Sequence, residues 1–219
     1  YDPSADLWVH RSTVPTAVAN VGAAVVDGMV YVPGGLTADE VSELAEGMIA
    51  TSYDATGQVA ETDASTAAQG LALSVDPITS HAEFTITRSC LLGGQVVLEG
   101  TRDREWDRAT HSGSSDLSLT KTHQDCTRPL RDADVTVTLN GADHVAVEAH
   151  HEWADGRRSG LQTLSMEGAV AWETSDDRSG TCEIDLDVTF DPETHTRAVE
   201  GQVCNRTFDV TTTWTHPAS

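Results

Sequence analysis

The segments GTCEIDLDVTF (180–190), DPETHT (191–196) and RAVEGQVCNRTFDVTTTW (197–214) decide the fold of this chain. In the first segment, apolar residues alternate with acidic residues or threonine. An alternation of apolar and polar residues with a period of two is typical of a strand with one buried and one solvent-exposed face. The second segment has the chemistry of a turn, because proline presets φ and aspartate can bond its own backbone. We therefore expect a hairpin that carries Cys182 and Cys204 near its open end.

Comparable strand-like runs follow one another from residue 81 onward. Connections such as Asn140-Gly141 and Met166-Glu167-Gly168 are short, which predicts antiparallel pairing of sequence neighbours. The expected fold class is mainly β, an antiparallel meander that forms either a β-sandwich or a barrel. The predicted strands are 83–88, 95–100, 116–120, 135–139, 144–152, 161–165, 169–173, 182–190, 197–204 and 208–214.

The 219-residue chain is strongly acidic, with 35 acidic residues against 13 basic ones and a formal net charge of −22. The negative electrostatic field of such a chain repels nucleic acid and anionic membranes, so neither is an expected partner. A salty or extracellular setting tolerates this surface, although a genome that favours arginine over lysine explains the lysine shortage equally well. The most apolar stretch, 14–33, is interrupted by Asn20 and Asp27, so no membrane span is expected. Because the chain opens at Tyr1, we expect a mature or trimmed product.

The chain has four cysteines, at positions 90, 126, 182 and 204. None of them forms a CxxC pair, so a zinc ribbon or a thioredoxin-type site has little support. We expect two disulfides and an extracellular or periplasmic location, with four buried free thiols as the alternative. Of the three possible pairings, proximity in sequence favours Cys90–Cys126 with Cys182–Cys204.

The first sixty residues differ in residue pattern from the rest of the chain. Two apolar runs flank Asp27-Gly28, a tight-hairpin signal, and Gly34-Gly35 ends the second run. Together with Tyr31, Trp8 and the Tyr-Asp pairs at 1–2 and 53–54, this arrangement resembles the kelch repeat, although the expected Trp after the second pair is absent. One blade cannot close a propeller, so the resemblance implies a β element that needs a cover from elsewhere.

The sequence predicts three regions: a kelch-like β element with a short helix (1–60), a linker (61–80) and a disulfide-bonded antiparallel β domain (81–219). The helix is expected near 38–47, because Thr37 and Glu40 have capping-box spacing and the next apolar residues form one stripe. We expect Val25, Val30 and Val32 to pack on strands beyond residue 81 or on another chain.

The run HVAVEAHHEW (144–153) is the candidate metal site. On a strand, one face carries imidazoles and carboxylates, which are ligands suited to zinc, copper or iron. The candidate ligands of a divalent metal are His144, Glu148, His150 and Glu152. The alternative is a solvated strand face in a protein that is acidic throughout.

Motifs of nucleophilic catalysis, dinucleotide binding and phosphate binding are absent from the sequence. We therefore expect a secreted or periplasmic, non-catalytic interaction or structural module, a subunit whose partners are other protein subunits or further copies of itself. The alternatives are a β-barrel carrier of a small apolar ligand and a metal-dependent enzyme. No catalytic residue and no organic cofactor is predicted.

Overall fold

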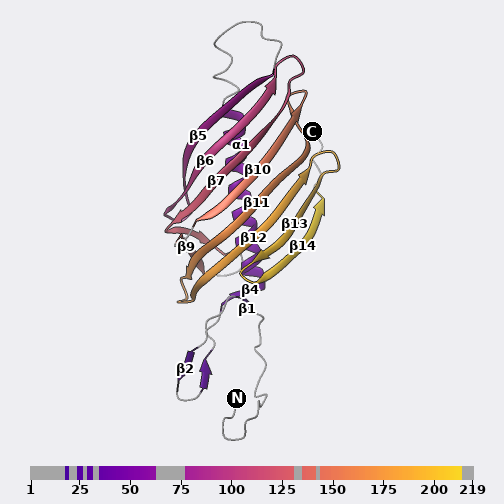
Figure 1. Cartoon of the computed structure of the whole chain (residues 1–219). Coiled ribbons are helices and arrows are strands. Elements are labelled where there is room, and N and C mark those ends of the chain that lie inside the picture. The colour runs from indigo at the N-terminus through magenta and orange to yellow at the C-terminus, as the bar shows by residue number, and fades with distance from the viewer. Residues whose placement is uncertain are drawn as a thin grey trace.

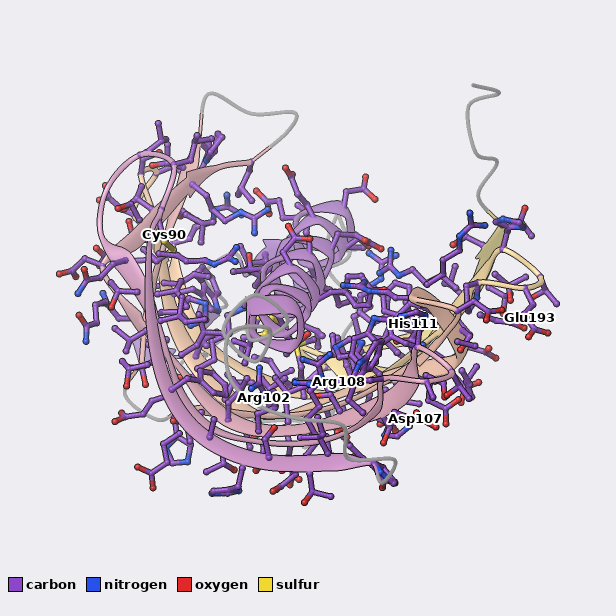
Figure 2. All side chains as sticks on the ribbon, turned by 90° about the horizontal axis from the view of Figure 1, so that it is seen from above. Cys90, Arg102, Asp107, Arg108, His111 and Glu193 are labelled. Carbon is purple, nitrogen blue, oxygen red and sulfur yellow. A yellow bond between two sulfur atoms is a disulfide. The ribbon has the colours of Figure 1, made fainter. Side chains whose placement is uncertain are left out.

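A computed structural model describes residues 18–19, 24–26, 29–31, 35–62, 77–130, 135–141 and 144–213. Within them, one long helix lies in the hollow of a strongly curved antiparallel sheet (Figure 1). Seen from above, the sheet forms a C-shaped wall around the helix, and Arg102 lies on its inner side (Figure 2).

The sheet has ten strands, and neighbours along its main path follow the order β14-β13-β12-β11-β10-β7-β6-β5. Because β5 and β14 are the two ends of this path and do not pair with each other in the described sheet, it is not closed into a barrel. The predicted mainly β, antiparallel meander is therefore confirmed, whereas the barrel alternative is not. The strands are β5 (Ile78–Ser89), β6 (Gln95–Asp107), β7 (Ser112–Gln124), β8 (Cys126–Pro129), β9 (Thr136–Asn140), β10 (Val145–Ala154), β11 (Arg157–Thr174), β12 (Ser179–Asp191), β13 (Thr196–Val203) and β14 (Arg206–Thr213).

The central strands bury one face and leave the other exposed. In β12, Cys182, Ile184, Leu186 and Val188 are buried while the residues between them are exposed, as the alternation predicts. The buried faces of the central strands share one core with the helix. The molecule thus has two layers, and the exposed acidic residues of β12 lie on its convex face.

Two predicted connections in the sheet are wrong. Met166-Glu167-Gly168 is not a turn, because β11 runs through it as one strand of 18 residues. Gly168 has a φ of 147° and approaches the backbone of His144 too closely to admit a Cβ, so this glycine serves a close strand contact. Asn140-Gly141 does not join a hairpin either, because β9 and β10 do not pair with each other. Both pair with β11, β10 along residues 157–168 and β9 along residues 171–174.

The short strands of the N-terminal region form two small sheets: β1 (Val18–Ala19) pairs with β4 (Leu36–Thr37), and β2 (Ala24–Val26) with β3 (Met29–Tyr31). The second pair confirms the hairpin expected around Asp27-Gly28. The kelch resemblance is not confirmed, because Tyr53-Asp54 lies inside the helix and Tyr1-Asp2, Trp8 and Gly34 lie outside the described residues. The side chains of Val25 and Val30 and the whole of Val32 also lie outside the described part, so their predicted packing stays a prediction.

Helix α1 (Ala38–Thr62) begins where the capping box predicts. The Thr37 amide donates to Glu40 Oε2 (2.6 Å), and the Glu40 amide donates to Thr37 Oγ1 (3.2 Å). The helix continues fifteen residues past the predicted end at 47, into the first two residues of the predicted linker. Its buried stripe continues through small or polar residues that carry little hydrophobic signal but let the helix approach the sheet closely. These residues are Ser52, Ala55 and Thr56.

Two arginines distant in sequence, Arg178 in the β11–β12 turn and Arg102 on β6, hold the two ends of α1. Near its beginning, Arg178 donates to both carboxylate oxygens of Glu40 (2.8 and 2.9 Å) and to Gly35 O (3.0 Å). Near its end, the buried side chain of Arg102 donates to Val59 O. A cation at this end also interacts favourably with the negative end of the helix dipole. The last turn of α1 contains no basic residue of its own that could do so.

Both predicted disulfides are present. Cys90–Cys126 has a Cα–Cα distance of 5.4 Å, and Cys182–Cys204 closes the open end of the β12–β13 hairpin with a Cα–Cα distance of 4.4 Å. Two disulfides indicate an oxidising, extracellular-type environment. Within the described residues, no helix combines the length and apolar character that a membrane crossing requires.

Leucine-to-alanine substitutions test the burial of α1. Leu44, on the buried face of α1, is fully buried. Leu44→Ala is therefore expected to lower the free energy of unfolding by about 3 kcal/mol, through lost burial and the cavity left behind. Leu161 is 52% exposed, and Leu161→Ala, the matched control, should change it by less than about 0.5 kcal/mol. Urea denaturation measures both, and equal effects would show that α1 does not fill the core.

The contact between Arg178 and Glu40 predicts a pH dependence. Hydrogen bonds from Arg178 hold the pKa of Glu40 below its usual value of 4.5, so the stability they add is present above that pH and is lost as the pH falls through the folded-state pKa. Arg178→Gln should cost about 2 kcal/mol at pH 7, and this cost should shrink below about pH 4. Urea denaturation from pH 3 to pH 7 measures the change, with the exposed Arg157→Gln as control. A cost that stays constant down to pH 3 contradicts the assignment.

Candidate functional site

A cavity of about 470 Å³ lies between the middle of α1 and the strands β5 to β9. One wall comes from the helix, through Gly47, Met48 and Thr51. The opposite wall comes from the concave face of the sheet and from the disulfide. It is formed by Arg88, Ser89, Cys90, Leu91, Val96, Lys121, His123, Cys126, Arg128, Pro129 and Leu139.

The register of the sheet brings cationic side chains to this wall. Arg88, Val96 and His123 are cross-strand neighbours in one row over β5, β6 and β7, and Lys121 lies two residues from His123 on the same face. Elsewhere this concave face is mostly apolar. Alternation on β7 therefore puts a lysine and a histidine at core positions.

Lys121 is 1% exposed and is the sole lysine of the chain. Its Nζ donates to Met48 O (3.1 Å) and to Ser52 Oγ (3.2 Å), both neutral acceptors on α1. Among the described residues, no carboxylate lies within ion-pair distance of Nζ. Burial, reinforced by the charges of Arg128 and Arg88, lowers the pKa of Lys121 to about 7.

His123 is 4% exposed, and its Nδ1 has no hydrogen-bond partner within the described structure. Burial lowers the pKa of His123 to about 3, with smaller contributions from Lys121 and Arg128. The imidazole is therefore neutral near pH 7. Of the nine buried side-chain polar atoms that lack a hydrogen-bond partner in the described structure, His123 Nδ1 is the one whose residue lines this cavity.

Arg128 extends from β8 across the surface of α1, where one guanidinium nitrogen donates to Glu43 O (3.4 Å). Burial lowers the pKa of Arg128, and the charge of Glu43 partly offsets this effect. The guanidinium occupies the space that a Cβ at position 47 would need. Gly47 weakens the helix relative to alanine but admits this cation to the cavity.

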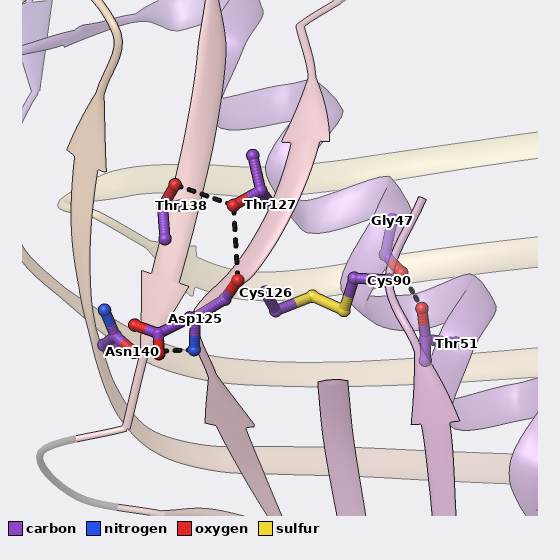
Figure 3. Close-up of a disulfide and its surroundings, with 8 residues drawn as sticks. All are labelled: Gly47, Thr51, Cys90, Asp125, Cys126, Thr127, Thr138 and Asn140. Carbon is purple, nitrogen blue, oxygen red and sulfur yellow. Dashed lines mark hydrogen bonds between the residues drawn. A yellow bond between two sulfur atoms is a disulfide. The ribbon is translucent and has the colours of Figure 1, made fainter. Parts of the chain in front are cut away.

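The disulfide Cys90–Cys126 holds the rim of the cavity next to α1 (Figure 3). It joins the β5–β6 turn to β8, and backbone hydrogen bonds from Leu92 to Thr127 (3.0 Å) and from Thr127 to Gly93 (2.9 Å) reinforce the connection. In the same region, Thr127 Oγ1 contacts Thr138 Oγ1 (2.9 Å). The turn is thus fixed from two sides, with Leu91 and Leu92 exposed at its tip (78% and 54%).

The predicted metal ligands lie elsewhere, on or next to the convex face of β10. His150 contacts Asp116 (2.7 Å) and Glu152 (3.3 Å), whereas Glu148 accepts a hydrogen bond from Ser118 (2.7 Å). His144 precedes β10 and is exposed. The structure therefore brings together only His150 and Glu152 of the four. The described residues contain no group of three or more histidine, cysteine or acidic side chains placed to hold a metal ion.

Sequence reasoning missed the basic residues of the cavity, although the sequence contained a signal for two of them. In the run LSLTKTH (117–123), Lys121 and His123 follow Leu117 and Leu119 in the same alternating phase. That phase places them on the buried face of the strand. No local pattern marks Arg128, which the β8–β9 pairing brings to the helix.

Comparison of the chain with protein-family models, curated proteins and solved structures found no match. The cavity has its own chemical character. It combines a largely apolar interior with buried cations and an unpartnered imidazole, a combination suited to holding a ligand.

Replacement of Lys121 by methionine tests its buried charge. Between pH 7 and 10.5 the unfolded chain keeps a proton on Lys121 that the folded protein has released, so Lys121 costs most stability at low pH and less as the pH rises through this window. Lys121→Met should raise the free energy of unfolding by about 1–4 kcal/mol at pH 6.5, and this gain should decrease towards pH 10.

Urea denaturation at several pH values measures the difference between Lys121→Met and wild type. The groups that face Lys121 are Arg88, His123 and Arg128 on the sheet and Ser52 on α1, with Glu43 and Asp54 at the rim. All of them are retained in the variant, so their own titration cancels to a first approximation. A gain that does not change with pH contradicts the assigned charge.

Proposed function

We propose that the protein is a non-catalytic binding module that holds a small ligand with an apolar body in the cavity under α1. The observation that carries this proposal is the cavity itself. Its volume of about 470 Å³ lies in the range typical of small-molecule sites, roughly 300–1,000 Å³. Met48, Val96 and Leu139 supply an apolar interior.

The architecture supports carriage of a ligand rather than its conversion. The sheet does not close on itself, so α1 serves as the cover of the concave face, and the cavity lies at the boundary between cover and sheet. A ligand can enter along this boundary without opening the hydrogen-bonded sheet. The nearby disulfide keeps the rim in place while the site is empty or filled.

A second candidate function is protein interaction, which one further observation favours. Leu91 and Leu92 are the two most exposed large apolar side chains of the described residues, and they lie side by side in a turn that the Cys90–Cys126 disulfide holds. A rigid, exposed apolar pair loses little entropy on docking. A secreted or periplasmic subunit that contacts another protein subunit, or a second copy of itself, through this turn agrees with the acidic composition and the disulfides.

Binding of N-phenyl-1-naphthylamine, a neutral apolar fluorophore, tests the principal proposal. Ala50 is exposed and lines the cavity, so Ala50→Phe should block the site without disturbing the core. We expect the wild-type protein to bind the probe with enhanced emission, and Ala50→Phe to weaken binding by at least about tenfold, equivalent to about 1.4 kcal/mol.

Glu46→Phe is the matched control, because Glu46 is an exposed position of the same helix that faces Arg197 on β13. This variant should bind the probe as the wild type does. If the wild-type protein fails to bind the probe, or if both variants bind it equally well, the cavity is not the binding site.

A further inference from the structure

The structure also indicates the chemical class of the ligand, an inference that rests on the proposed binding function. We infer that the ligand carries an acidic head group, a carboxylate or a phosphate monoester. Lys121, His123 and Arg128 hold this head group, and the apolar body lies along Met48 and Val96.

Lys121 and Arg128 have few anionic partners in the described structure. Lys121 Nζ donates only to the neutral oxygens of Met48 and Ser52, and the hydrogen bond of Arg128 ends on a backbone carbonyl. Glu43 acts on Arg128 from the helix, and Asp54 is exposed at the rim. Like charges buried together destabilise one another unless an anion joins them. An acidic head group in the cavity supplies that anion.

His123 provides an independent indication. Its Nδ1 is buried, lacks a partner in the described structure, and belongs to a side chain that lines the same cavity as the two cations. Lys121, His123 and Arg128 all line this one cavity, and the first two lie two residues apart on the same face of β7. A neutral imidazole can donate one hydrogen bond to an acid oxygen while the cations balance its charge.

The charge of the whole protein favours an amphipathic anion over a free inorganic one. A net charge of −22 repels small anions from the surface, and the cavity has to overcome this repulsion. Burial of an apolar body provides the additional affinity. The site therefore selects ligands that combine an acid group with a hydrocarbon or aromatic part, and inorganic phosphate alone should bind weakly.

Displacement of N-phenyl-1-naphthylamine by three ten-carbon competitors tests the inference. Decan-1-ol, decanoate and decyl phosphate share the same chain and differ in the head group. In the wild-type protein, decanoate or decyl phosphate should displace the probe at a concentration at least tenfold lower than decan-1-ol does. The tighter of the two acids identifies whether the head group is a carboxylate or a phosphate.

Two variants locate the head group. Lys121→Met and Arg128→Gln should each remove most of the preference for acids, measured within each variant as the ratio of the displacing concentrations of decan-1-ol and the acid. Arg197→Gln is the control, because this arginine pairs with Glu46 away from the cavity and should leave the preference intact. Thermal melting confirms that each variant is folded, and the two independent variants keep the test valid if one of them unfolds.

The outcomes separate the two proposals. If the wild-type protein binds neither the probe nor any competitor, the proposed binding function fails and the inference fails with it. If the probe binds in the cavity but decan-1-ol competes as well as the acids, the binding function stands and the acidic head group is refuted. A preference for acids that survives in both cavity variants also refutes the inference, since the anion then binds elsewhere.

Discussion

The structure depends on the burial of one helix in the hollow of an open sheet. A closed barrel covers its own interior, whereas this curved sheet leaves its apolar concave face without a second sheet, and α1 provides the cover. Arg178, from the β11–β12 turn, and Arg102, from β6, fix the two ends of the helix. Between these anchors the contact is not complete: Gly47 leaves room for the guanidinium of Arg128, and the cavity opens beside it. The candidate site is thus a consequence of how the sheet is covered.

Features encoded by neighbouring residues could be predicted from the sequence. The alternation in β12 reports burial at every second residue, and the Thr37–Glu40 box marks the first turn of α1. Features that depend on distant partners could not be predicted. The second half of α1 is buried through Ser52 and Thr56, whose polarity is tolerated because both hydroxyls are hydrogen-bonded. The sequence predicts a turn at Gly168, whereas the structure requires glycine there because the backbone of His144 approaches too closely for a Cβ.

The candidate site shows the same division. His150 and Glu152 form a conspicuous local pattern, and the structure places them on a solvated face, where they contact each other and Asp116. Lys121 is inconspicuous in the sequence but lies in the core, and only the packing of α1 over β7 brings it beside Met48 and Ser52. A strand pattern shows which face is buried but does not identify what covers that face. The chemistry of this cavity depends on the cover.

The position of α1 in the chain has a consequence for folding. The helix precedes all ten strands of the sheet it packs on, and its contacts join residues far apart in sequence: Ser52 to Met166 over 114 residues and Glu46 to Arg197 over 151. Such contacts close long loops and slow the search for the native state. During synthesis, α1 leaves the ribosome before any strand exists to receive its apolar stripe. The chain therefore completes its core only when its last hundred residues are available, and until then it is exposed to aggregation and needs protection.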